Sequence, residues 1–363
     1  MGSERIIPDA GFVNLHNHTH YSVLDGASKV PDLVKRVKEL GQTAVGITDH
    51  GNMHGAYELW SEAVKQGIKP IIGIEAYVTP GTSRFDKTRV HWGTEAQQKA
   101  GDDVSNRGEY NHLTLWAEND RGLKNLIKAS SDASLDAGTS HPRMDQELLE
   151  KYHEGIIVGS GCPSGAIQTH LRLGQYDEAL KYAEFLQDLF GKENFYVELM
   201  DHGLSIENRV RSDLLGIADY LHAPLVATND SHYVRPEDAE SQDAMLCINS
   251  GRHLDDPGRF KFDGAGYYIK SAQEMRELFK DLPQAVGNTV EIAERCNVMF
   301  DDHEDGAYMP KFDCPEGWDE TSLFLRQVQE GLERRYPDGV PQEVSEQADY
   351  ECGVICQDRK SVV

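Results

Sequence analysis

The chain has 363 residues, of which 39% are hydrophobic and 27% are charged, and its formal net charge is −25. This apolar fraction suffices for a packed core and excludes a largely disordered chain, and the length suits one large α/β barrel or two ordinary domains. The acidity argues against a free-standing protein that binds DNA non-specifically, because such binding depends on Lys and Arg. It leaves a phosphodiester substrate open, because bound divalent cations reverse the local field.

We expect neither a targeting signal nor a disulfide framework from this sequence. No apolar run reaches about 18 residues, the length that a membrane helix needs, and the N-terminus MGSERIIPDAG lacks the apolar core of a signal peptide. The six cysteines include no CxxC pair. We therefore expect a reduced, cytoplasmic protein without membrane contact.

Short apolar runs alternate with amphipathic stretches along most of the chain. The helical spacing of Leu33, Val37 and Leu40, followed by Gly41 as a stop, is typical of this pattern. In chain order, the predicted strands are 12–16, 44–48, 70–78, 112–117, 155–160, 195–200 and 224–229. The predicted helices are 30–41, 56–67, 122–133, 176–191, 207–223, 283–296 and 321–336.

This alternation predicts an α/β fold built from right-handed βαβ units with a parallel sheet. Seven strands favour a distorted (β/α)7 TIM-like barrel, and a doubly wound sheet is the alternative. Residues 80–110 are polar and Gly-rich, which predicts a surface insertion. After about residue 283 the alternation ends in a mostly helical segment with an acidic linker at 301–320. We expect two domains, 1–282 and 283–363.

Metal-competent side chains collect at the ends of the predicted strands. The carboxyl ends of parallel barrel strands face one rim, where barrel enzymes place their sites. His16 and His18 are two residues apart in an extended segment and so point to the same side, and Asp230 and His232 repeat this spacing. His112 precedes its strand and joins the rim only if the chain bends there. The candidate metal ligands are His16, His18, Asp25, His50, Glu75, His112, Cys162, Asp230 and His232.

Imidazole, carboxylate and thiolate groups suit Zn²⁺, Mn²⁺ or Fe²⁺. Nine donors exceed the needs of one tetrahedral ion, so we expect two to three divalent metal ions that share carboxylates, an arrangement typical of phosphoester hydrolysis. Each residue alone has a less specific explanation: a single His is usually hydrogen-bonded or solvated, and a single Cys is usually a small buried hydrophobe. The conjunction of all nine at strand ends favours the metal site.

Several other residues and motifs carry weaker signals. His20 shares the parity of His18, but we place it outside the metal site. We expect Asp49 to orient His50 or another ligand, and Glu198 to be a solvated carboxylate or a hydrogen-bond acceptor beside a ligand. GSGCPSG lacks the GK[ST] ending of a P-loop, and no GxGxxG or GxSxG supports nucleotide binding or serine hydrolysis. Surface or core positions are expected for His91, His141, His153, His170, His202, His222, His253 and His303.

Six segments resemble the N-terminal PHP (polymerase and histidinol phosphatase) domain of the bacterial C-family replicative DNA polymerases, the DNA polymerase III alpha subunits. They are LHNHTHYSVLDG, VGITDHGNMHGAYE, PIIGIEAYV, NHLTLWAENDRGLKNLIKASS, GIIVGSGCPSG and LVATNDSHYV. The resemblance covers about residues 12–280. Residues 283–356 look like the start of the polymerase palm region, whereas the final DRKSVV departs from the family pattern.

The resemblance implies a distorted (β/α)7 barrel with a trinuclear metal site. The family's ligand positions match the nine candidates named above; Glu75 bridges the metals, and Asp25, His50, Glu75 and Asp230 act in catalysis through them. Members with the full set resemble metal-dependent 3′–5′ exonucleases that proofread the DNA primer 3′ end for the attached polymerase. The implied partners are the remaining polymerase domains and replisome subunits such as the sliding clamp.

Two alternative functions remain on the same fold. A stand-alone phosphatase of the histidinol phosphatase kind is disfavoured by the palm-like segment after residue 283. A metal-stabilised structural domain without nuclease activity is disfavoured by the complete donor set, although a site can be kept for stability alone. The polymerase carboxylates of the family lie further along than this sequence reaches, so we expect no polymerisation by this chain alone.

Overall fold

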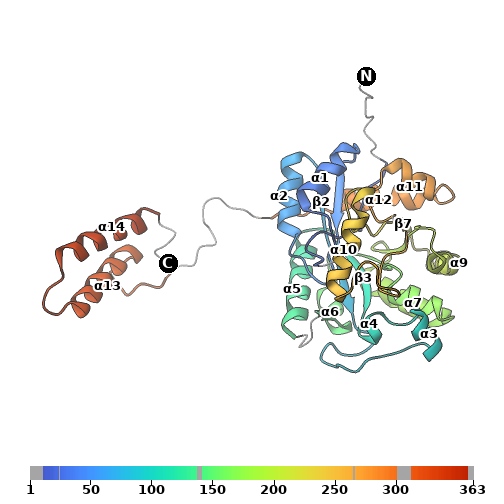
Figure 1. The fold of residues 1–363 in the computed structure, drawn as a ribbon, viewed down its shortest axis with the longest axis horizontal. Coiled ribbons are helices and arrows are strands. Elements are labelled where there is room, and N and C mark those ends of the chain that lie inside the picture. Colours follow the sequence, from blue (N-terminus) through green and yellow to red (C-terminus); the bar gives the residue numbers. More distant parts are fainter. Residues whose placement is uncertain (1–10, 24, 137–140, 265, 301–311, 359–363) are drawn as a thin grey trace, which may run out of the picture. The chain divides into compact units, whose positions relative to one another are not determined.

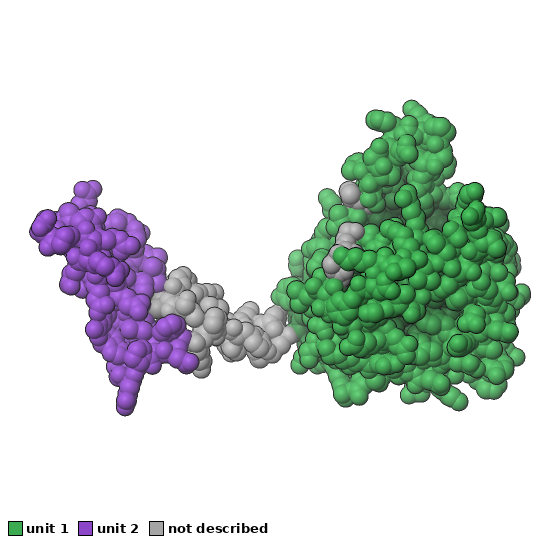
Figure 2. All heavy atoms as spheres, turned by 90° about the horizontal axis from the view of Figure 1, so that it is seen from below, with its two compact units in different colours: residues 1–300 green, residues 301–363 purple. Residues whose placement is uncertain are grey.

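A computed structural model describes residues 11–23, 25–136, 141–264, 266–300 and 312–358. Residues 1–300 form one compact unit and residues 301–363 a second unit, coloured separately in Figure 2. His303, the first part of the predicted linker and residues 359–363 lie outside the described residues.

The predicted strands and helices are confirmed with small shifts at their ends, except at the first strand (Figure 1). The strands are β1 (Ala44–Ile47), β2 (Lys69–Val78), β3 (Asn111–Ala117), β4 (Arg143–Met144), β5 (Ile156–Gly159), β6 (Phe195–Leu199) and β7 (Leu225–Ala227). The helices of the first unit are α1 (Val30–Glu39), α2 (Ala56–Gln66), α3 (Glu95–Ala100), α4 (Ser105–Gly108), α5 (Asp120–Asp136), α6 (Gln146–Tyr152), α7 (Ala166–Arg172), α8 (Tyr176–Phe190), α9 (Ser205–Leu221), the 3₁₀ turn η1 (Pro236–Asp238), α10 (Ala239–Ser250), α11 (Ala272–Leu278) and α12 (Pro283–Arg295).

One strand runs against the others. The sheet order is β1-β2-β3-β5-β6-β7, with β4 beside β2. All of its pairs are parallel except those that β3 makes with β2 and β5. The expectation of a fully parallel sheet is therefore wrong at β3. The connection 80–110 does not carry the chain back to the other end of the sheet; Asn111 instead pairs with Val78 where β2 ends.

The first predicted strand, 12–16, forms isolated bridges instead of a ladder, and these bridges link the two ends of the sheet. Asn14 pairs with Val45 of β1, whereas Asn17 pairs with Ser231, just beyond β7. The backbone N–H of His18 donates to the Ser231 carbonyl at 2.7 Å. Since this segment lies between β1 and the chain after β7, the strands form a distorted barrel, as predicted.

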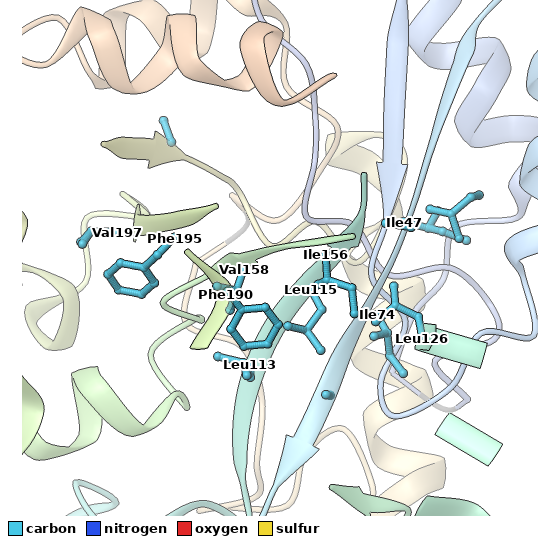
Figure 3. Close-up of a cluster of buried hydrophobic side chains, with 14 of the residues drawn as sticks. Ile47, Ile74, Leu113, Leu115, Leu126, Ile156, Val158, Phe190, Phe195 and Val197 are labelled. Carbon is cyan, nitrogen blue, oxygen red and sulfur yellow. The ribbon is translucent and has the colours of Figure 1, made fainter. Parts of the chain in front are cut away.

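The two faces of the sheet form two separate cores. Residues that face the surrounding helices form the larger core, which includes Ile47, Ile74, Leu115 and Val158 (Figure 3). Strand residues whose side chains point to the opposite face form a second core, and these residues are Ala44, Ile71, Trp116, Ile157, Tyr196 and Val226. Because side chains alternate between faces along a strand, this second set marks the barrel interior.

Helix α12 belongs to the barrel unit. Its residues Ile292 and Ala293 pack into the interior core. The Thr289 hydroxyl accepts a hydrogen bond from the Val13 N–H at 3.0 Å, and the Asn288 side chain donates to the Leu225 carbonyl at 2.7 Å. The expected boundary at 282/283 therefore differs from the structure, in which the compact units divide at 300/301. Helix α12 stays with the first unit because its apolar face packs against the interior of the barrel.

The second unit contains α13 (Glu320–Arg335), which confirms the predicted helix 321–336, and α14 (Gln342–Asp358). Asp319 caps α13 by accepting a hydrogen bond from the Ser322 N–H at 2.7 Å. Among the helices that the structure describes, none combines the length and apolar character required to cross a bilayer.

Candidate metal centre

The strand positions whose side chains point into the barrel supply the interior core at one end of the strands and predicted ligands at the other end. In β2, Ile71 belongs to the interior core and Glu75, four residues later, points to the same side. In β6, Tyr196 and Glu198 repeat this relation. The antiparallel direction of β3 reverses the order, so that Trp116 lies in the core and His112 lies at the rim. The reversal explains how His112 reaches the site although it begins its strand.

All nine predicted ligands lie in one continuous network. Glu75 is at its centre: its carboxylate oxygens lie 2.7 Å from His50 Nδ1, 3.0 Å from His112 Nδ1 and 3.3 Å from His16 Nε2. A further contact of 3.6 Å joins Glu75 Oε2 to His18 Nε2.

Two further carboxylates join the remaining imidazoles. Asp230 Oδ1 lies 3.0 Å from His18 Nε2 and 3.3 Å from His16 Nε2. Asp25 contacts His232 Nε2 at 2.9 Å and His50 Nε2 at 3.3 Å. Three overlapping groups have donor atoms within 4.8 Å of one another: His18, His50 and His232; His16, His18 and Asp230; and His50, Glu75 and His112.

The donor atoms are close together but poorly directed at one another. Among the described residues, the buried side-chain atoms without a hydrogen-bond partner include His16 Nε2, His18 Nε2, Asp25 Oδ1, His50 Nδ1, both oxygens of Glu75, Asp230 Oδ1 and His232 Nε2. Leaving so many buried polar atoms unpaired is costly. Their convergence fits a group of divalent cations, which would satisfy all of them together.

Hydrogen bonds on the far side of three rings fix the nitrogen that faces the site. His16 Nδ1 donates to Glu198 Oε1 at 2.7 Å, and His232 Nδ1 donates to the carbonyl of Asp230 at 2.9 Å. In the neutral form of each ring the single proton lies on Nδ1, so that Nε2 presents a lone pair to the centre.

The third ring is held through a relay. Ser22 Oγ donates its proton to Asp49 at 2.7 Å and therefore accepts from His18 Nδ1 at 3.0 Å. The same hydroxyl accepts from the backbone N–H of His50 at 3.1 Å. Asp49 thus orients His18 through Ser22, one of the outcomes that the sequence left open.

Glu198 is more important to the site than the sequence suggested. The side chain is fully buried, so the expectation of a solvated carboxylate is wrong, and the alternative of a hydrogen-bond acceptor is confirmed. Besides His16, it accepts from Thr228 Oγ1 at 2.6 Å and from Thr114 Oγ1 at 2.9 Å. A carboxylate at an inward position of an otherwise apolar strand was the available signal.

Cys162 approaches the network through His112. Its Sγ lies 3.4 Å from His112 Nδ1. Gly161 before it has φ +88°, and a Cβ there would lie 2.9 Å from the His112 carbonyl oxygen, so a residue with a side chain would be strained. The GSGCPSG turn therefore positions a thiol beside His112.

Burial and opposite charges shift the pKa values within the site in both directions. Burial opposes ionisation of Glu75, yet the neighbouring His112, His16 and His50 hold the pKa of this carboxyl well below its usual range. Burial, together with the nearby His50 and His232 rings, lowers the pKa of His18 to about 3. Burial raises the pKa of the Cys162 thiol, as do Glu75 and Asp230. Ionised carboxylates beside a neutral imidazole suit cation binding.

The backbone is also unusual at one candidate ligand. Asp230 has φ +45°, a left-handed conformation that few residues with a side chain adopt. The residues on either side of Asp230, Asn229 and Ser231, both donate side-chain hydrogen bonds to the Tyr268 carbonyl. The surrounding contacts thus hold Asp230 in a strained position that points its carboxylate at the centre.

His20 is exposed and takes part in none of the ligand groups found among the described residues. Two further histidines outside the prediction are paired with carboxylates that are not predicted ligands: His91 with Asp103 at 3.0 Å, and His202 with Glu207 at 2.6 Å. A cavity of about 990 Å³, whose lining includes Thr79, Asn111 and Tyr182, contains none of the nine predicted ligands. The predicted ligands are thus recognised by their convergence and not by this cavity.

Comparison with known proteins identifies the family. The profile of the PHP domain matches residues 14–202, more than half of the chain. The chain belongs to the PHP domain family. The matched region ends before Asp230 and His232, and the structure shows that these two residues lie in the same network as the earlier PHP residues.

Relatives of this PHP chain are DNA polymerase III alpha subunits. The chain is 51% identical over 349 residues to the DNA polymerase III subunit alpha of Mycobacterium tuberculosis, which covers 96% of this chain and 29% of that protein. The corresponding subunit of Saccharopolyspora erythraea is 51% identical, covering 96% and 30%, and that of Treponema pallidum is 40% identical, covering 95% and 28%. The resemblance found in the sequence is confirmed, and the chain spans less than a third of these relatives.

Proposed function

We propose that this chain is a metal-dependent phosphodiesterase that removes nucleotides from a DNA 3′ end, as the proofreading 3′–5′ exonuclease of a replicative polymerase. The observation that carries the proposal is the complete set of nine donors in one network, with its buried atoms left unpaired by the protein itself. The similarity to DNA polymerase III alpha subunits supports DNA as the substrate.

The residues that would hold two to three ions are His16, His18, Asp25, His50, Glu75, His112, Cys162, Asp230 and His232. Closely spaced divalent ions activate water and stabilise both the attacking and the leaving oxygen of a phosphodiester. Both oxygens of Glu75 are buried without a hydrogen-bond partner, so this carboxylate would hold more than one ion. Zn²⁺, Mn²⁺ and Fe²⁺ all suit this mixture of nitrogen, oxygen and sulfur donors.

The chain's own residues perform three tasks in this proposal. Glu198 and the Ser22–Asp49 relay hold the His16 and His18 rings so that Nε2 faces the centre. The buried Glu75 joins four imidazoles at the inner side of the site. Asp25 and Asp230, with side chains 23% and 15% exposed, mark the side from which a substrate reaches the network, because His16, His18 and Glu75 are fully buried.

The wider role follows from the relatives and remains part of the proposal. The partners would be the DNA primer 3′ end, further polymerase domains and replisome subunits such as the sliding clamp, in the cytoplasm. With a net charge of −25, the chain alone should bind DNA weakly and lose activity as salt rises. We expect no templated nucleotide incorporation by this chain by itself.

The test combines metal analysis with release of 3′ nucleotides from an end-labelled single strand in Mn²⁺ or Zn²⁺. Two to three ions per chain and nucleotide release that Asp230→Ala abolishes are expected, with His20→Ala as the matched control because His20 is exposed beside the site. Equal cleavage by wild type and Asp230→Ala would overturn the assignment. Hydrolysis of phosphomonoesters alone would favour the phosphatase, and metal binding without hydrolysis would favour a structural domain.

A further inference from the structure

A loop beside the metal centre presents aromatic side chains that the proposed chemistry does not use. It follows α10 and spans residues 251–264, with the sequence GRHLDDPGRFKFDG. Phe260 within it is 65% exposed. A single exposed aromatic ring is common on protein surfaces, and it is the position of this ring beside the predicted metal ligands that suggests a ligand for it.

The rings of the loop form a row that begins at a predicted metal ligand. Phe262 lies edge-on to the His232 ring, with centroids 4.6 Å apart, and also 4.6 Å from Tyr267. Phe260 lies one ring further out, 5.9 Å from Phe262 in an edge-to-face arrangement. The row therefore leads from the metal centre towards solvent.

Hydrogen bonds of Arg259 attach the loop to α10. The Arg259 guanidinium donates to both carboxylate oxygens of Asp243 on α10, each at 2.5 Å, and its Nε donates to the Leu254 carbonyl at 3.0 Å. The Arg259 side chain is only 7% exposed. This paired arginine fixes the chain immediately before Phe260, so the exposed ring is presented on a preorganised support.

We infer that Phe260 and Phe262 form a stacking platform for the last bases of a single-stranded nucleic acid whose 3′ end enters the metal centre. This inference rests on the proposed function. Aromatic rings bind every base through its π-face, so a proofreading site can accept any sequence without reading base edges. Stacking also supplies affinity that a strongly acidic chain does not obtain from phosphate contacts. Lys261, which lies between the two aromatic residues in sequence, is exposed and adds a positive charge to this loop.

The platform is tested by binding and by turnover on the full chain. The probe is a fluorescent single strand whose last linkages are phosphorothioates, which resist hydrolysis, so that anisotropy reports binding alone. Phe260→Ala should weaken binding by about five- to a hundredfold, the range expected for one stacked base. Phe260→Trp should restore it, and KM for a normal strand should rise in Phe260→Ala much more than kcat falls. Tyr220→Ala, an equally exposed aromatic near the far end of α9, is the matched control.

A second strand, abasic at its last two positions, shows whether the bases are the partner. Wild type and Phe260→Ala should bind this strand equally, because the ring has nothing to stack on. Two results would overturn the platform. One is equal affinity of wild type and Phe260→Ala for the normal strand; the other is a loss of affinity in Phe260→Ala that is as large on the abasic strand as on the normal strand. If wild type hydrolyses no DNA, the proposed function falls while the anisotropy result still decides the platform.

Discussion

The two ends of the barrel interior are built from the same strands with opposite chemistry. At one end, Ile71, Trp116 and Tyr196 pack against α12 in a fully buried apolar core. At the other end, a few residues along the same strands, Glu75 and Glu198 are equally buried but belong to a network of charged groups with unpaired atoms.

The contrast separates stability from function within one alternating pattern. Each buried apolar side chain at the apolar end stabilises the folded state. The polar end costs free energy until cations satisfy it, and the strained backbone of Asp230 adds to this cost. The fold thus tolerates an unfavourable site because the opposite end of the same strands is well packed.

The largest effect is expected from Glu75→Gln, which keeps the shape of the side chain and removes its charge. Glu75 contacts four imidazoles, so nucleotide release should fall by orders of magnitude and the number of bound ions should drop. Metal analysis and the 3′ nucleotide assay measure both. An active variant with a full complement of ions would show that Glu75 bridges nothing.

Next in size is Ile292→Ala, which tests the apolar end. Ile292 is fully buried, so its truncation should leave a cavity and lower the free energy of unfolding by about 2–5 kcal/mol. Denaturant unfolding measures this change, and the metal content of the folded protein should stay that of wild type. A stability equal to wild type would mean that α12 does not close the barrel.

Glu198→Gln should weaken metal binding about tenfold to a hundredfold, the usual effect of removing a carboxylate behind a ligating His. In this variant a neutral amide replaces the carboxylate that accepts the hydrogen bond from His16 Nδ1. Competition with a chelator measures the affinity. The matched control is Asp103→Asn, which alters a carboxylate–histidine pair with His91 outside the predicted ligand set and should leave metal affinity unchanged. Equal effects in the two variants would argue against a specific role for Glu198.

The smallest effect is expected from His20→Ala. His20 has the same parity as His16 and His18 but is exposed, and the network does not include it. Metal content and nucleotide release should stay within about twofold of wild type, as is usual for a surface substitution. A large loss would extend the metal centre beyond the nine residues.

The sequence by itself determined the elements, the barrel and the candidate ligands of this protein. Strand β2 and helix α8 lie almost where periodicity placed them, because burial of an apolar face is a local pattern. His16, Glu75 and Asp230 could be proposed together because strand ends in a barrel share a rim.

Only the tertiary structure decided how distant segments meet. The direction of β3 depends on where the long connection 80–110 returns to the sheet, and this reversal brings His112 to the rim. The membership of α12 in the first unit depends on packing against strands far away in sequence. The burial of Glu198 and the approach of Phe262 to His232 likewise join residues 30 or more positions from their partners. These contacts arise from closure of the barrel, and no local spacing encodes them.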